Sequence, residues 1–129
     1  MNSLVIKKEV TSNINDVIKK LETNLQLEGF GVLTRIDFSK KIEEKLKHKI
    51  PEVVILGACN PSFAYEAYQK NTAVTAVIPC NVTVSDIGHG RVSVEIAKPS
   101  ALMNALGNGE LVELAASADK KLARVLEGI

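Results

Sequence analysis

Hydrophobic and polar positions along the chain switch between two periods, and the switches predict a regular succession of strands and helices. Strand patterns, with alternating or continuous apolar residues, cover residues 4–10, 31–38, 53–58, 73–85 and 91–97. Apolar residues at three- and four-residue spacing predict helices over residues 14–28, 39–48, 61–71, 99–106 and 109–127. Within the second strand, the alternation predicts that Phe30, Val32, Ile36 and Phe38 share one face.

The helix boundaries are marked by residues that satisfy free backbone groups. Asn13, Asn60 and Asn108 stand where three of the helices begin, and Asn is among the best N-caps. Pro61 follows Asn60, and proline is favoured at the first helical position. Gly29 is expected to end the first helix in a left-handed conformation.

The order of these elements, β-α-β-α-β-α-β-β-α-α, indicates an α+β fold. The continuous apolar run from Val53 to Ala58 suits a central strand buried on both faces. We expect this strand to pair in parallel with the strand beginning at Ala73, through a right-handed crossover. The turn at Ile87–Gly90 instead makes an antiparallel hairpin. The expected structure is a single domain over residues 1–129, with a mixed sheet covered by helices.

Composition narrows the classes of partner. The chain has 129 residues, with 16 basic and 15 acidic side chains and no Trp. Such a balanced charge gives no field that attracts a polyanion, and few aromatic rings are available for base stacking, so no nucleic-acid partner is expected. The sequence lacks the roughly 18 consecutive apolar residues of a membrane span, and no membrane association is expected. We predict a cytoplasmic protein whose two cysteines stay reduced.

The candidate chemistry lies at the two cysteines. Cys59 ends a buried strand immediately before a helix, where the helix dipole lowers the pKa of a thiol if the sulfur is accessible. The alternative is that Cys59 is a small apolar core residue. Cys80 follows Pro79 and shares a predicted face with Val82, which favours a buried core thiol.

The expected parallel pairing brings the two thiols together. Cys59 and Cys80 would stand level on neighbouring strands, about 4.8 Å apart. The pocket formed there suits an anion, a soft metal or a reactive small molecule. Its predicted ligand-binding residues are Cys59, Asn60, Cys80 and Asn81.

Other chemistry has little support in the sequence. There is no CxxC motif, His89 lies in the hairpin turn, and His48 ends a lysine-rich helix, so we expect neither an intrinsic zinc site nor a cofactor. The basic run Lys40–Lys49 is diluted by glutamates, and we interpret it as a solvated helix face. No nucleotide-binding or hydrolase motif occurs, so no reaction is predicted and enzymatic activity stays open.

Three ordered segments carry a family likeness. These are EGFGVLTRID (Glu28–Asp37), VILGACNP (Val54–Pro61) and IPCNVTV (Ile78–Val84). Together they resemble the domain of unknown function 302 family of small bacterial and archaeal proteins. The resemblance implies a compact domain of helices packed on a sheet, commonly a homodimer, with no assigned activity or catalytic residues.

Three functions remain open at this stage. The favoured one is a small-ligand or thiol-chemistry site around Cys59 and Cys80. The alternative is a non-catalytic homodimeric interaction module, with contacts sought at the stripe of Ile42 and Leu46 and at the tail Gly128–Ile129. Transition-metal binding through paired thiols, from one or two subunits, is the weaker alternative.

Overall fold

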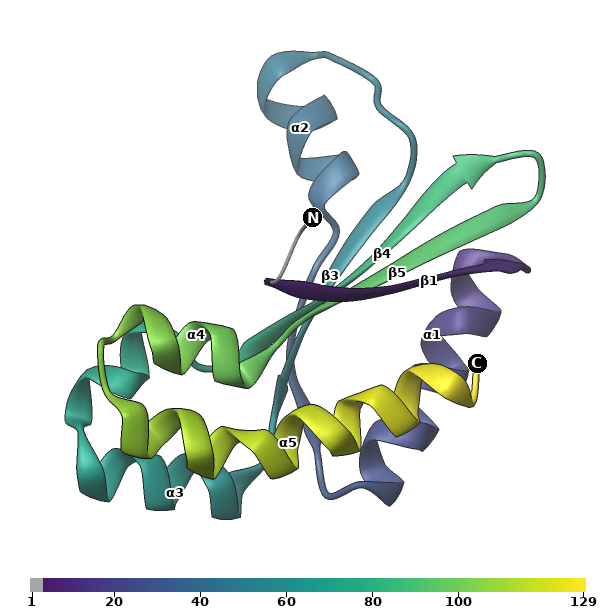
Figure 1. Cartoon of the computed structure of the whole chain (residues 1–129). Coiled ribbons are helices and arrows are strands. Elements are labelled where there is room, and N and C mark those ends of the chain that lie inside the picture. Colours follow the sequence, from purple (N-terminus) through teal and green to yellow (C-terminus); the bar gives the residue numbers. More distant parts are fainter. Residues whose placement is uncertain (1–3) are drawn as a thin grey trace.

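The computed structural model, which describes residues 4–129, contains a five-stranded sheet in the order β1-β5-β4-β3-β2 (Figure 1). The strands are β1 (Val5–Thr11), β2 (Gly31–Ile36), β3 (Val53–Cys59), β4 (Cys80–Gly88) and β5 (Arg91–Ala97). The helices are α1 (Ile14–Leu27), α2 (Phe38–Leu46), α3 (Pro61–Lys70), the 3₁₀ helix η1 (Thr72–Ala76), α4 (Pro99–Ala105) and α5 (Gly109–Glu127). The predicted α+β class and element order are confirmed. Within residues 4–129, none of the helices is long and apolar enough to span a membrane.

The predicted helix caps are present. The side chain of Asn13 accepts a hydrogen bond from the Asp16 amide at 3.0 Å, and Asn108 caps α5 in the same way. Gly29 follows α1 with φ of +84°, a left-handed conformation that favours glycine. Local sequence therefore determines where these helices begin and end.

The main core lies between one face of the sheet and two helices, α1 and α5. The central strands contribute Val54, Leu56, Val82, Val84, Val94 and Ile96, all of them buried. A second, smaller cluster joins α3, η1, α4 and the first half of α5, and it consists of Ala67, Val74, Met103, Leu111 and Ala115. This second cluster holds the ends of α3 and α4 against the end of the sheet, where the candidate site lies.

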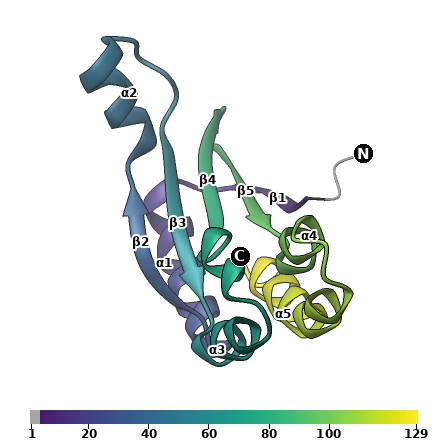
Figure 2. The same ribbon diagram turned by 90° about the vertical axis from the view of Figure 1, so that its left-hand side faces the viewer.

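The predicted parallel pairing is wrong, because every pairing in the sheet is antiparallel. Residues 72–76 form η1 rather than the start of a strand. Helix α3 and η1 stay at the end of the sheet where β3 finishes (Figure 2), so β4 starts at that same end. A parallel partner would have to return to the opposite end before pairing.

The predicted common face of the second strand is also wrong, because of a β-bulge. The pairing shifts between Val32 and Thr34, so that Val32 opposes Ala58 whereas Ile36 opposes Ile55. One extra residue in a strand exchanges the two faces beyond it. Val32 therefore packs against the main core, and Ile36 points away from it.

The outer face of β3 is closed by a tight contact rather than by a helix. A Cβ added at Gly57 would overlap the Thr34 hydroxyl and would come within 2.9 Å of a ring carbon of Pro79. Because only glycine leaves room for both neighbours, this contact sets the distance between β2, β3 and the segment that enters β4.

Candidate functional site

A small cavity lies where β3 ends and α3 begins, and both cysteines line it. Its volume is about 10 Å³, which is room for about one water molecule. The lining residues are Phe30, Ala58, Cys59, Asn60, Phe63, Ala64, Ile78, Cys80 and Pro99. The cavity is thus mostly apolar, and the thiols and Asn60 supply its polar groups.

Asn60 is the fixed polar residue of this cavity. Its side chain is buried and accepts a hydrogen bond from the Phe63 amide at 3.2 Å. Pro61 occupies the first turn of α3, where its missing N–H costs nothing. The cap therefore holds Asn60 and Phe63 in a defined position at the cavity wall.

Cys80 is a core thiol, as the sequence predicts. It is 5% exposed and opposes Ala58 across the β3–β4 pairing. Burial raises the pKa of Cys80 from 9.0 to about 12, with further contributions from Cys59 and Asp119. At neutral pH Cys80 is a protonated, unreactive thiol.

Cys59 is half-buried, and its ionisation differs from the sequence-based expectation. Burial raises the pKa of the Cys59 thiol, whereas a position before a helix predicts a lowered pKa. The cause of the raised pKa is desolvation of the thiolate by burial, at a cavity that Phe30, Phe63 and Ala64 also line. The structure does not support an activated nucleophile at Cys59.

The two thiols meet in one cavity by a different route from the predicted one. Cys59 opposes Gly31 on β2, and Cys80 opposes Ala58, so the cysteines are offset by one residue rather than level. They remain close enough for Cys59 to raise the pKa of Cys80. Asn81 is exposed, opposes Gly57 and lies outside the cavity lining.

Metal ligands do not gather at this site. Among residues 4–129, no three His, Cys, Asp or Glu side chains form a group that could hold a metal ion. His89 lies in the β4–β5 hairpin turn, with φ of +57°. His48 lies beyond the end of α2 and is exposed.

A groove between α3 and α5 adjoins the thiol cavity and was not predicted from the sequence. Its volume is about 110 Å³, and it shares Asn60 and Phe63 with the cavity. The remaining lining residues are Ser62, Glu66, Leu114, Ser117, Ala118 and Lys121. The α5 residues form a stripe at helical spacing, a signal visible in the sequence, but that spacing alone does not show which helix faces it.

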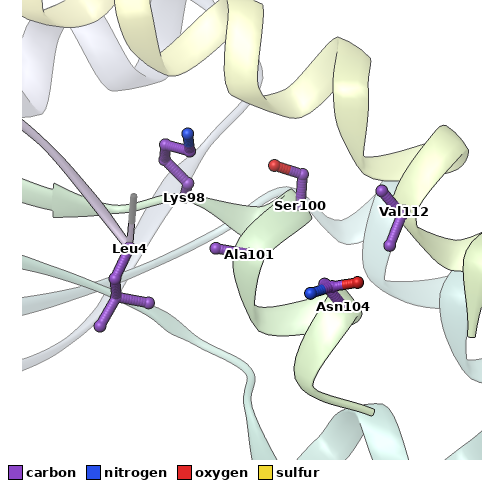
Figure 3. A pocket seen from close by; sticks show the side chains of 6 residues that line it. All are labelled: Leu4, Lys98, Ser100, Ala101, Asn104 and Val112. Atoms are coloured by element: carbon purple, nitrogen blue, oxygen red, sulfur yellow. The ribbon is translucent and has the colours of Figure 1, made fainter. Parts of the chain in front are cut away.

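A wider hollow of about 390 Å³ lies between the start of β1 and α4, and it is lined by Leu4, Lys98, Ser100, Ala101, Asn104 and Val112 (Figure 3). The polar side chains that line this hollow either make hydrogen bonds within the fold or point away from one another. The Ser100 hydroxyl donates to the Asp119 carboxylate, which also accepts from the Ser100 amide at 3.0 Å. The side chains of Lys98 and Leu4 point in opposite directions (Figure 3). This arrangement caps α4 rather than converging on a ligand.

The antiparallel sheet, the helices on one face and the thiol-lined cavity define a small α+β protein. The chain belongs to the family described as "Domain of unknown function DUF302", whose profile matches residues 6–129. It is similar to a solved structure, the crystal structure of uncharacterized conserved protein DUF302 from Bacillus stearothermophilus. The two chains are 31% identical, 98% of each is covered, and the TM-score is 0.90. No curated protein matches the chain.

Proposed function

We propose that this chain is a non-catalytic interaction module that forms a homodimer. The observation that carries this proposal is a group of large apolar side chains left exposed on β2 and α2. Leu33, Ile36, Phe38 and Leu46 are 64%, 46%, 38% and 61% exposed, respectively. We call these four residues the arm surface.

The position of α2 supports an assembly role. Helix α2 projects away from the other helices at one edge of the sheet (Figure 1), and Leu33 is the extra residue of the β2 bulge. The four exposed apolar side chains belong to two consecutive elements, β2 and α2 with its first residue, and exposed apolar surface is a feature of interaction sites. A helix that contributes little to the main core is explained more readily by a contact outside the chain.

Charge favours a second copy as the occupant. The formal net charge of the chain is +1, so two copies repel each other only weakly. The charged residues of α2 include both signs, with Lys41 and Glu44 forming an ion pair at 3.7 Å. In a twofold dimer the same apolar surface meets itself, and the arm surface is suited to such a contact.

The test is the oligomeric state of a variant. We expect the native chain to have the mass of a dimer in light scattering, and Leu46→Glu to raise the dimer dissociation constant at least tenfold, because a buried carboxylate at the contact costs free energy. Leu27→Glu is the matched control, since Leu27 is 79% exposed on α1, away from the arm surface. The measurement is made at about 100 µM chain, a concentration in the range of dissociation constants for weak protein complexes. A monomeric native chain at that concentration would contradict the proposal. Equal dimer dissociation constants for the two variants would contradict it as well.

The second candidate function is small-ligand binding or thiol chemistry at Cys59 and Cys80. The observation in its favour is that both thiols and the buried Asn60 line one cavity. Two free cysteines suit a reducing compartment such as the cytosol, where we place the protein.

The rate of alkylation of Cys59 as a function of pH tests this second candidate. Because burial raises the pKa of Cys59, we expect a reaction midpoint above the usual value of about 8.5. Site-by-site mass spectrometry of the native chain and of Cys80→Ala separates the two thiols. A midpoint well below that value would restore thiol chemistry as the leading function.

A further inference from the structure

We infer that the groove between α3 and α5 binds a small zwitterion of the size of a free amino acid. The groove is lined by one carboxylate, Glu66 on α3, and one ammonium group, Lys121 on α5. This inference does not depend on the arm surface, which lies on β2 and α2.

The two charged groups are available to a ligand. None of the ion pairs within 4.0 Å among residues 4–129 involves Glu66 or Lys121. Glu66 acts on Lys70 only at longer range, as Lys121 does on Glu28. Opposite charges on facing helices that are not joined in a contact pair leave space for a molecule that carries both charges.

The uncharged lining completes a polar site with an apolar wall. Ser62 and Ser117 place hydroxyl groups on opposite sides of the groove, while Phe63, Leu114 and Ala118 provide apolar surface. Ser62 and Glu66 are four residues apart on α3 and therefore lie on the same side of that helix. The positive end of the α3 dipole lies at Ser62 and not at Glu66.

These charges orient the ligand. The carboxylate of the zwitterion lies between Lys121 and the first turn of α3, and its ammonium group lies at Glu66, one turn further along. On the same measure that gives the thiol cavity room for one water, the groove volume of about 110 Å³ has room for several waters, or for a ligand of about six non-hydrogen atoms. Asn60 and Phe63 separate this ligand from Cys59 and Cys80.

The experiment is a titration of the native chain, observed through backbone amide chemical shifts of α3 and α5. The probes are L-alanine, propionate and ethylamine at constant ionic strength, because the last two each lack one charged group of the first. We expect saturable shifts with L-alanine in the millimolar range, and binding of propionate and ethylamine at least fivefold weaker, since each loses one charged contact.

Two substitutions test the assigned residues. Glu66→Gln and Lys121→Gln are each expected to weaken binding of L-alanine about fivefold, whereas Lys120→Gln, at an exposed position outside the groove lining, changes it less than twofold. Circular dichroism confirms that each variant is folded. The inference is overturned if L-alanine causes no saturable chemical-shift change up to about 50 mM, which is well above the expected dissociation constant. It is also overturned if propionate binds as tightly as L-alanine, or if Lys121→Gln binds L-alanine as tightly as the native chain does.

Discussion

Cys80 is expected to lower the free energy of unfolding above pH 9, by up to about 1.4 kcal/mol for each pH unit. The pKa of Cys80 is raised from 9.0 to about 12 in the folded chain. Between these two values the unfolded chain loses the thiol proton while the folded chain keeps it, so stability falls as pH rises. Below pH 9 both states hold the proton, and Cys80 contributes no pH dependence.

Urea denaturation under reducing conditions at pH 8, 9, 10 and 11 (values that start below the window and extend into it, on the basis of proton linkage) measures this effect. The matched variant is Cys80→Ala, which removes the thiol from the same site and leaves the remaining titrating groups in place. Its free energy of unfolding is expected to decline less steeply above pH 9 than that of the native chain. Parallel declines in the two chains would show that the Cys80 thiol is not desolvated as the structure indicates.

Local features of the fold follow from short segments of sequence, which is why they could be predicted. The caps at Asn13, Asn60 and Asn108 each depend on one side chain and an amide three residues later. The turn at Gly88–Gly90 likewise depends on residues with positive φ that are adjacent in the chain. No distant residue is needed for either effect.

Strand pairing could not be predicted in the same way, because it depends on where the intervening segment ends in space. The apolar run of β3 is equally compatible with a parallel and an antiparallel partner. The decision is made by η1, since residues 72–76 add a turn of 3₁₀ helix instead of extending toward the other end of the sheet. The β2 bulge is a similar case, because one extra residue at Leu33 exchanges faces without any break in the alternation.

The candidate site was predicted in its position but not in its chemistry. Cys59, Asn60 and Cys80 do meet in one cavity, yet Asn81 lies outside it. Sequence places Cys59 beside a helix dipole but does not show that Phe30 and Phe63 line the same cavity as its thiol. The desolvation that raises the pKa of Cys59 depends on tertiary contacts that the sequence does not show.

The groove between α3 and α5 also could not be predicted from the sequence, because it depends on how two helices pack. Ser117 and Lys121 are one turn apart on α5, and nothing in that spacing distinguishes a groove wall from a solvated face. The second core cluster, through Ala67 and Ala115, sets α3 against α5 and so brings Glu66 and Lys121 to the same groove. A contact made for packing thus creates a polar surface that can bind a ligand.

Substitution of Leu25 by alanine is expected to reduce the free energy of unfolding by about 2–5 kcal/mol. Leu25 is 0% exposed and belongs to the main core, so removing its side chain loses apolar burial and leaves a cavity. The matched control is Leu27→Ala in the same helix, because Leu27 is 79% exposed and its substitution should change stability by less than about 0.5 kcal/mol.

Urea denaturation monitored by circular dichroism measures the free energy of unfolding of the native chain and of each of the two variants. The contrast between Leu25 and Leu27 depends on which face of α1 meets the sheet, while helix propensity is equal for the two substitutions. If Leu25→Ala and Leu27→Ala lower stability equally, α1 does not bury the face that the structure assigns to it. The assignment of the main core to α1, α5 and the sheet would then be wrong. An unequal result of the expected size would instead establish the helix orientation that also positions Gly29 beside Asn60 at the cavity wall.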